Sequence, residues 1–310
     1  MDLSVIIVSY NSRGHLARCL QAVLAGAEKV KWEAIVVDNA SHDGSPEMVA
    51  REFPNVSLIA NRENVGFARG CNQGFRMARG ESLLFLNPDT EAKPGSIAAL
   101  IGYLRDNPSL GAVGPRLCTP NGQLARSCFR FPSLTRPLLN SRPLQLLVGE
   151  RFGLAYPLED PRVREGGTVD WLSGACLLVH RQALDEAGPL DERYFMYFED
   201  TDLCRRIWRA GWQVVFWPNA EVLHVGGASS RGQWARLSTE LQRSRLIYFS
   251  THHPGLVCGV MRCIAGIASL ARSLRWLATL QPQHLGTEAK ILRVALARVN
   301  SLASTSSIGG

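Results

Sequence analysis

Residues 34–45 read Ala-Ile-Val-Val-Asp-Asn-Ala-Ser-His-Asp-Gly-Ser, an apolar run that ends at an acidic residue and continues into a turn. The β-branched run at 34–37 predicts a buried strand, and residues 46–52 after the turn predict a helix. The same order of buried strand, polar turn and amphipathic helix recurs at residues 3–24 and 56–78. Such alternation is typical of an α/β fold with a mostly parallel central sheet covered by helices.

Residues 1–114 are therefore predicted to form a Rossmann-like, nucleotide-binding half, with a fourth strand at 82–86. The seven prolines and many arginines of residues 115–165 break the pattern and predict long loops or a hairpin insertion that borders the site. Beyond this insertion we expect a strand at 169–179, helices at 182–187 and 199–210, strands at 214–217 and 222–224, and helices at 236–249 and 256–280.

The composition is that of an ordinary globular protein. Its 310 residues, 46% hydrophobic and 20% charged, suffice for one large α/β domain or two small ones. The start Met-Asp-Leu-Ser is acidic and lacks a basic n-region, so no secretory signal is predicted and the protein is expected in the cytoplasm. The eight cysteines occur without a CxxC pair. This spacing argues against zinc, iron–sulfur and disulfide frameworks and predicts reduced cysteines in the core.

Much of the net charge of +7 lies in the C-terminal segment. Residues 254–303 contain six basic side chains and a single acidic one, so a basic stripe on the body of the protein is not supported and nucleic-acid binding is not expected. Within 256–280, Arg262, Arg272 and Arg275 make the expected helix too charged to span a membrane but suited to lie among lipid headgroups. Packing of this helix on the rest of the protein explains its composition equally well.

Polar residues follow each of the first four predicted strands: Ser9-Tyr10-Asn11, Asp38-Asn39, Asn61-Arg62-Glu63-Asn64 and Asn87-Pro88-Asp89. In doubly wound sheets, ligands bind at the carboxyl ends of the strands. Loops rich in Asp and Asn favour hydrogen bonds to a sugar or nucleobase, together with a metal ion. Neither GxxxxGK[ST] nor GxGxxG follows the first strand, which argues against P-loop ATPases and dinucleotide-dependent dehydrogenases.

Three groups of residues could carry chemistry. Asp89 has the character of half a Mg²⁺ or Mn²⁺ site, although Asn-Pro-Asp is also a common turn. The acids Glu199, Asp200 and Asp202 follow an aromatic run at an expected helix start. There they either complement the helix dipole or place a carboxylate with a raised pKa beside an apolar wall. His224 ends a strand and gains meaning as a metal ligand only if it converges with Asp89.

Taken together, the motifs resemble those of the family 2 inverting glycosyltransferases with the GT-A fold, in particular their rhamnosyltransferase-like branch. The resemblance covers residues 2–250 and rests on Val-Ser-Tyr-Asn at 8–11, Val-Val-Asp-Asn-Ala-Ser-His-Asp-Gly-Ser at 36–45, Asn-Val-Gly-Phe-Ala-Arg-Gly-Cys-Asn-Gln-Gly at 64–74, Asn-Pro-Asp at 87–89, Phe-Met-Tyr-Phe-Glu-Asp-Thr-Asp-Leu-Cys at 195–204 and His-Val-Gly-Gly at 224–227. It implies transfer of a sugar such as rhamnose, from a dTDP- or UDP-linked donor to a glycan or polyprenyl-linked acceptor, in cell-surface polysaccharide or O-antigen synthesis. The alternative is a catalytically inactive, nucleotide-sugar-binding partner of a glycan assembly complex.

The resemblance also implies roles for individual residues. The implied donor-binding residues are Ser9, Tyr10, Asn11, Asp38, Asn64, Gly66, Phe67, Asn72 and Asn87. Asp89, as the last acid of the DxD motif, and His224 are implied to hold a divalent cation, Mg²⁺ or Mn²⁺. Asp200 corresponds to the catalytic base and Glu199 to its support. Trp171, Gly174 and Asp202 are expected on the acceptor side.

Two features depart from the family pattern. Asn87 replaces the first acid of DxD, so the metal site carries less charge and is expected to favour the cation when the donor is present. The Gln-x-x-Arg-Trp element of processive members is missing, which predicts the addition of a single sugar. The implied organisation begins with a GT-A domain at 1–250, which has a donor half at 1–114 and an acceptor half at 115–250. A basic apolar helical segment follows at 251–303 and is expected to attach peripherally to the inner face of the membrane. Residues 304–310 are expected to form a disordered tail.

Overall fold

The computed structural model describes residues 1–27, 30–133, 155–156, 159–226 and 234–297. The chain divides into two compact units. The sheet unit comprises Met1–Val65, Arg69–Leu190 and Asp200–Ser229, and the helical unit comprises Gly66–Ala68, Asp191–Glu199 and Ser230–Gly310. Each unit therefore gathers segments that are far apart in the sequence.

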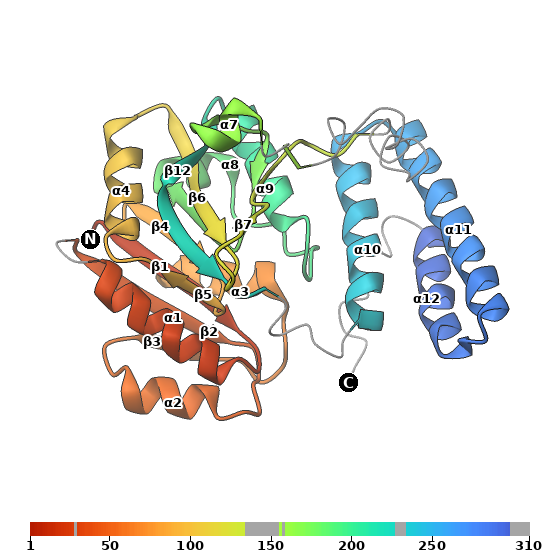
Figure 1. Ribbon diagram of the computed structural model, residues 1–310, viewed down its shortest axis with the longest axis horizontal. Helices are drawn as coiled ribbons and strands as arrows, with labels where there is room; N and C mark the ends of the chain where they lie inside the picture. The colour runs from red at the N-terminus through yellow and green to blue at the C-terminus, as the bar shows by residue number, and fades with distance from the viewer. Residues whose placement is uncertain (28–29, 134–154, 157–158, 227–233, 298–310) are drawn as a thin grey trace. The chain divides into compact units, whose positions relative to one another are not determined.

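A mixed sheet forms the centre of the sheet unit (Figure 1). Its main strands lie in the order β3-β2-β1-β4-β11-β6-β12-β5. Their bounds are β1 Leu3–Ser9, β2 Trp32–Asp38, β3 Ser57–Ala60, β4 Ser82–Leu86, β5 Thr90–Ala92, β6 Leu110–Cys118, β11 Cys176–His180 and β12 Gln213–His224. β1 to β4 pair in parallel, β12 runs parallel to β6, and β11 is antiparallel to β4 and β6. The predicted α/β class with a mostly parallel central sheet is confirmed.

Helices cover both faces of this sheet because the side chains of β1 alternate in direction. On one face, Leu3, Val5 and Ile7 join a core with α1 (Arg13–Gly26), α2 (Ser45–Glu52) and α4 (Ser96–Asp106). On the other face, Ile6 meets α3 (Phe67–Met77) at Gly74, where an added Cβ would lie 2.5 Å from Cγ2 of Ile6. Glycine at position 74 therefore lets α3 lie directly against the sheet.

Two stretches differ from the strands expected at them. Residues 169–179 do not form one strand, because β10 (Trp171–Leu172) pairs with β8 (Cys128–Phe129), whereas β11 pairs with β4 and β6. Just before this stretch, β9 (Gly167–Thr168) pairs with β12. The strands expected at 214–217 and 222–224 are a single strand, β12, whose register on β6 shifts between Trp217 and Glu221. Pro218 lies within this shift and cannot donate a ladder hydrogen bond, so the pairing is interrupted there.

The insertion expected at 115–165 is partly regular. β6 extends into it as far as Cys118, and β7 (Leu124–Ala125), β8 and α7 (Pro161–Arg164) follow. Residues 134–154 lie outside the described part of the chain. The helices expected at 182–187 and 199–210 are confirmed as α8 (Arg181–Ala187) and α9 (Glu199–Arg209).

The helical unit contains three long helices, α10 (Trp234–His252), α11 (Gly255–Ala278) and α12 (Leu285–Leu296), with the short 3₁₀ helix η2 at Pro282–His284. α10 and α11 confirm the expected helices, and α12 lies within the helical segment expected at 251–303, although its own bounds are not predicted from the sequence pattern. Ser269 and Arg272 of α11 bind the buried Glu288 of α12. Despite its arginines, α11 is long and apolar enough to cross a membrane by length and composition. The tail expected at 304–310 lies outside the described residues.

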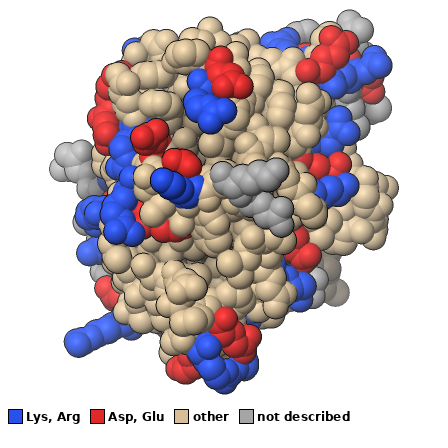
Figure 2. Space-filling view, turned by 90° about the vertical axis from the view of Figure 1, so that its left-hand side faces the viewer, with Lys and Arg blue, Asp and Glu red and all other residues tan. Residues whose placement is uncertain are grey.

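The cysteines are free, as predicted, and seven of the eight are buried. Cys263 on α11 is exposed, so the expectation that the cysteines belong to the core is wrong at this position. Around the sheet unit, charges of both signs are interspersed on the face seen in Figure 2. Ion pairs of the sheet unit include Arg18 with Glu91 at 2.8 Å and Arg105 with Asp106 at 3.4 Å.

Candidate active site

Asp38 ends β2 with a side chain that is only 1% exposed. Its Oδ2 atom accepts a hydrogen bond from the Ser41 N–H at 2.8 Å. Its Oδ1 atom is buried and receives no hydrogen bond from the described residues. A buried carboxylate oxygen without a donor is costly unless a ligand or water supplies one. Asp38 thus presents an acceptor at the carboxyl end of a parallel strand, the edge at which such sheets bind ligands.

The loops that follow β1 and β2 hold each other in place. The Asn11 N–H donates to Ser41 Oγ at 2.9 Å, and Asn11 Oδ1 accepts from the His42 N–H at 2.8 Å. Asn11 has a φ of 48°, a left-handed conformation that Asn adopts more readily than most residues. Ser9 is fully buried and shares a hydrogen bond with Ser12 at 2.8 Å. Ser9 and Asn11 therefore shape the loop through their polar groups, and Tyr10 between them is partly exposed.

Antiparallel pairing of β12 with β5 brings Asp89 and His224 together. His224 lies opposite Thr90 in this pairing, and the Val225 N–H donates to the Asp89 carbonyl at 3.0 Å. As a result, Nε2 of His224 lies 3.3 Å from Oδ1 of Asp89. His224 thus converges with Asp89, as a metal site shared by the two side chains requires.

The Asp89–His224 pair offers two ligands of the kinds that Mg²⁺ and Mn²⁺ accept. Burial by itself raises the pKa of Asp89, but the hydrogen bond and charge of His224 outweigh it and hold that pKa below its ordinary value. Asp89 is therefore ionised at neutral pH. Among the described residues, no group of three or more His, Cys, Asp or Glu side chains converges. The pair fits a cation whose remaining ligands come from substrate oxygens or water.

Asp200 lies in the first turn of α9 and is held by neutral donors. Its Oδ2 accepts from the Gly174 N–H at 2.9 Å, and its Oδ1 accepts from the N–H and hydroxyl of Thr201 at 2.7 and 3.2 Å. Residue Asp200 is partly exposed, but its carboxyl group is surrounded by protein. This burial raises the pKa of Asp200, although the three hydrogen bonds act to lower that pKa. A carboxylate with a raised pKa is suited to accept a proton near neutral pH. The structure thus joins two predicted site residues, Gly174 and Asp200.

Trp171 stacks on Phe129 across the small sheet formed by β10 and β8. The ring centroids are 4.2 Å apart with an interplanar angle of 16°, and Trp171 Nε1 donates to the Arg130 carbonyl at 3.0 Å. Both rings are partly exposed. Trp171 precedes Gly174 by three positions, so an aromatic surface adjoins the backbone that holds Asp200. No local sequence pattern marks Phe129 as the cross-strand partner of Trp171.

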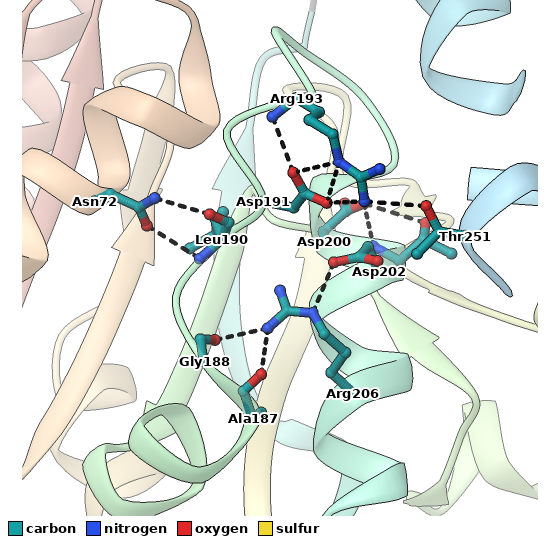
Figure 3. Close-up of polar contacts among 11 residues, drawn as sticks. Asn72, Ala187, Gly188, Leu190, Asp191, Arg193, Asp200, Asp202, Arg206 and Thr251 are labelled. Carbon is teal, nitrogen blue, oxygen red and sulfur yellow. Dashed lines mark hydrogen bonds and ion pairs between the residues drawn. The ribbon is translucent and has the colours of Figure 1, made fainter. Parts of the chain in front are cut away.

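Two other predicted site residues are fully engaged with the protein (Figure 3). Both polar groups of the Asn72 side chain bind the backbone of Leu190, at 2.8 Å for Nδ2 to the carbonyl and 3.0 Å for the N–H to Oδ1. Asp202, 1% exposed, accepts from Arg206 Nε at 2.8 Å. Asn72 and Asp202 therefore stabilise the fold around α3 and α9. The spacing of Asp202 and Arg206, four residues apart on one helix, is a sequence signal that could have identified this pair.

The remaining predicted residues are characterised mainly by the backbone contacts and conformations in which they take part. In the sheet unit, the Asn87 N–H donates to Ala175 and its carbonyl accepts from Thr90 Oγ1 at 2.7 Å, while Asn64 is partly buried. In the helical unit, Gly66 has a φ of +87°, and the Phe67 N–H donates to the Phe195 carbonyl at 2.7 Å. Glu199, also in that unit, is buried at the start of α9.

Comparison with known proteins points to one family. Residues 4–146 match the family described as glycosyl transferase family 2. Over 266 residues, the chain is 35% identical to an N-acetylglucosaminyl-diphospho-decaprenol L-rhamnosyltransferase of Mycobacterium tuberculosis, covering 82% of this chain and 85% of the relative. It is also 24% identical, over 239 residues, to the rhamnosyltransferase WbbL of Escherichia coli K12, covering 75% of this chain and 86% of the relative.

Solved structures with the same fold include the mannosyltransferase PcManGT from Pyrobaculum calidifontis, determined with GDP-Man and Mn²⁺. The similarity has a TM-score of 0.54 at 17% sequence identity and covers 95% of this chain and 86% of the other. At this level of identity the likeness concerns the fold alone. It confirms the GT-A architecture that the sequence motifs predicted.

Proposed function

Because the chain belongs to glycosyl transferase family 2 and is a glycosyltransferase, we propose that it transfers rhamnose from a nucleoside-diphosphate donor to a lipid-linked glycan in cell-surface polysaccharide synthesis. The observation that carries the catalytic part is Asp200, a carboxyl with a raised pKa that is held by backbone and hydroxyl donors. The rhamnosyl specificity is supported by the names of the mycobacterial and E. coli relatives.

Asp200 serves as the general base of an inverting displacement. A single displacement needs one group to take the proton of the acceptor hydroxyl as that oxygen attacks the sugar. Because its pKa is raised, Asp200 is a stronger base than an ordinary, solvated carboxylate and is better suited to accept this proton. The Gly174 N–H fixes the direction of the carboxylate, and Glu199 supports it from the adjacent position.

The donor nucleoside binds at the carboxyl ends of β1 and β2. The unsatisfied Oδ1 atom of Asp38 is suited to accept a hydrogen bond from a ribose hydroxyl or a base N–H. Tyr10, partly exposed on the neighbouring loop, is placed to pack on the same ligand. Asn64, Gly66 and Phe67 are proposed to contact the diphosphate and sugar, and a dTDP- or UDP-linked donor is the one we favour.

Asp89 and His224 are proposed to hold a divalent cation, Mg²⁺ or Mn²⁺. A bound cation would offset the charge that develops on the leaving diphosphate. The pair supplies one carboxylate and one imidazole, in keeping with Asn87 at the position of a second acid. The Mn²⁺ in the mannosyltransferase complex is consistent with a cation in this fold.

The acceptor is proposed to rest on the aromatic surface formed by Trp171 and Phe129. Stacked aromatic rings offer a flat apolar face with polar edges, which suits the C–H face of a sugar ring. The acceptor named for the mycobacterial relative is an N-acetylglucosaminyl-diphospho-decaprenol. A glycan on a polyprenyl diphosphate is therefore the acceptor class that we infer for this chain.

A lipid-linked acceptor calls for contact with a membrane, and we infer that α11 provides it. Six large apolar side chains of α11 are 40 to 82% exposed: Leu256, Val260, Ile267, Leu270, Leu274 and Leu277. Their spacing places them along one face of the helix, opposite the buried Cys258, Met261, Ala265 and Ser269. We name this exposed set the α11 stripe. Soluble monomers usually expose large apolar side chains singly, and a row of them along one face marks an interaction surface.

Charge complementarity favours an anionic lipid surface as the partner of the α11 stripe. Arg262 and Arg275 flank the stripe on opposite sides by their helical positions. The acid of this hairpin, Glu288, is buried and paired with Arg272. That pair and Ser269 hold α11 on α12, which supports a helix that lies in the interface over one that crosses the bilayer.

Vesicle sedimentation tests the membrane proposal. Ile267→Glu and Leu274→Glu should each abolish binding to vesicles that contain phosphatidylglycerol, and the wild type should bind pure phosphatidylcholine vesicles much more weakly. Ala289→Glu introduces the same charge at an exposed position of α12 outside the stripe and should still bind. If the wild type instead forms a dimer in solution that Ile267→Glu dissociates, the stripe is a self-association surface and the membrane proposal is wrong.

Kinetics of Asp200→Asn tests the catalytic proposal. With dTDP-rhamnose and a short polyprenyl-diphosphate acceptor, we expect transfer to slow by roughly 10²- to 10⁴-fold, with the donor KM nearly unchanged. Asp185→Asn, at an exposed acid of α8, is the matched control and should retain activity. Full activity of Asp200→Asn would remove Asp200 as the base. A wild type that binds nucleotide yet transfers no sugar from any donor would favour the inactive-partner alternative.

A further inference from the structure

The turn that precedes Glu199 and Asp200 is strained. Tyr197 and Phe198 have φ angles of 69° and 67°, so two consecutive aromatic residues adopt the left-handed conformation. Residues with a Cβ atom rarely enter this region, and bulky ones in succession remain there only when surrounding contacts hold them. Because α9 begins at the next residue, this turn determines the direction in which the helix starts.

α10 supplies contacts that hold this turn, all within the helical unit. Ser244 Oγ donates to the Met196 carbonyl at 2.8 Å, immediately before the strained pair. The ring of Tyr248 lies 5.4 Å from the ring of Phe198, measured between centroids. Ser244 and Tyr248 are buried and lie four residues apart, so they occupy one face of α10.

A third contact continues along the same face of α10. Thr251 follows Tyr248 by three residues, and its Oγ1 accepts from Arg193 Nη2 at 3.1 Å (Figure 3). Arg193 is in turn fixed by the carboxylate of Asp191, with Nε at 2.9 and 3.0 Å from the two oxygens. The segment from Arg193 to Phe198 is thus anchored to α10 before, at and after the Met196 carbonyl.

The same segment is tied to a predicted donor-binding loop. The Phe195 carbonyl accepts from the Phe67 N–H at 2.7 Å. A Cβ on Gly66 would lie only 2.6 Å from that carbonyl, so the two backbones approach as closely as glycine allows. One short segment therefore connects a donor-side loop with the residue that starts α9.

We propose that Ser244 and Tyr248 of α10 are positioning residues that impose the left-handed turn and thereby orient the Glu199–Asp200 pair. This inference rests on the proposed role of Asp200 as the base. If the turn relaxes to negative φ, the peptide that leads into Glu199 reorients and the carboxylate shifts. Misplacement by about 1 Å can reduce a rate by up to roughly 10²-fold.

A double-mutant cycle measures whether Ser244 acts through the strained turn. Ser244→Ala should lower kcat about tenfold with the donor KM within about twofold of wild type, since the turn and not the donor site is released. Tyr197→Gly places at 197 a residue that adopts positive φ without strain. In that background Ser244→Ala should lower kcat by less than about threefold. Ser250→Ala, which removes a hydroxyl bonded to its own helix at Ile247, is the control and should leave kcat unchanged.

Hydrogen exchange makes the inference testable without activity. In Ser244→Ala, the amides of residues 194–199 should exchange at least about tenfold faster, while those of β1 remain as in wild type and those of Ser250→Ala do not change. Unchanged exchange at 194–199 would overturn the proposal whether or not the enzyme is active. Faster exchange in a protein that shows no transfer would overturn the proposed function instead, and equal effects of Ser244→Ala in both backgrounds would show that Ser244 does not act through Tyr197.

Discussion

Replacing glycine by alanine at two helical positions is expected to change stability in opposite directions. In α4, nothing lies within 4 Å of a Cβ built on Gly102, so Gly102→Ala gains helix propensity without a clash and should stabilise by about 0.5–1 kcal/mol. In α3, a Cβ on Gly74 would lie 2.5 Å from Ile6 Cγ2, well inside van der Waals contact. Ile6 is buried in β1 and held by pairing on both sides.

The clash at Gly74 outweighs the gain in propensity. Overpacking of a buried site costs typically about 1–3 kcal/mol, against a gain of up to about 1 kcal/mol for alanine in a helix. Gly74→Ala should therefore destabilise by about 1–2 kcal/mol. Ile6→Ala removes the clashing methyl group, so the cost of Gly74→Ala should fall to about zero in that background, a clear departure from additivity.

Urea unfolding followed by circular dichroism gives the measurement. If the m value is unchanged, the urea concentration at the midpoint of unfolding should be higher for Gly102→Ala than for the wild type and lower for Gly74→Ala. The reasoning is refuted if Gly74→Ala is as stable as the wild type, or if its cost is the same with and without Ile6→Ala. Either result would mean that α3 lies farther from β1 than the structure places it.

Three further predictions concern the site. Arg206→Met should destabilise by about 3–5 kcal/mol in urea unfolding, because it leaves Asp202 buried without its cation, whereas Arg209→Met on the exposed side of α9 should change stability by less than about 0.5 kcal/mol. Asp89→Ala should lose the Mn²⁺-dependent part of the thermal stabilisation given by dTDP or UDP, and an equal Mn²⁺ effect in the variant would remove Asp89 from the cation site. Burial raises the folded-state pKa of Asp200, so the stability tied to its protonated form is complete below the unfolded pKa and is lost as pH rises through the folded pKa. The melting temperature of Asp200→Asn relative to wild type should therefore increase as pH rises through this window, and a constant difference would contradict the raised pKa.

The strands and helices of the first ninety or so residues could be predicted closely, because their signal is local. β4 begins and ends at Ser82 and Leu86 as expected, and the helix expected at 46–52 differs from α2 by a residue at one end. Each of these elements has a buried face whose spacing is visible in a window of several residues. The pattern of residues 169–179 lacks this property, because β10 pairs with β8 whereas β11 pairs with β4 and β6.

The site residues divide along the same line. Local sequence could nominate Asp89 as half of a metal site, but only the pairing of β12 with β5 brings His224 within 3.3 Å of it. Asn72 belongs to one of the motifs that carry the family resemblance, yet its side chain binds the backbone of Leu190. No local sequence pattern could reveal this contact. Motif resemblance therefore nominates the residues of the candidate site, and long-range pairing determines which of them the structure brings together.

The acidic cluster at the start of α9 shows why the partner of each carboxylate matters more than its position near the helix dipole. Asp202 lies one turn from a guanidinium and is neutralised by it. Asp200 receives hydrogen bonds from the backbone N–H of Gly174, in the turn between β10 and β11, and from Thr201. Neutral donors stabilise the anion less than a cation does, so burial prevails and the pKa of Asp200 rises. A carboxyl whose pKa is raised in this way is the better candidate for the proposed general base, whereas Asp202 is held in an ion pair.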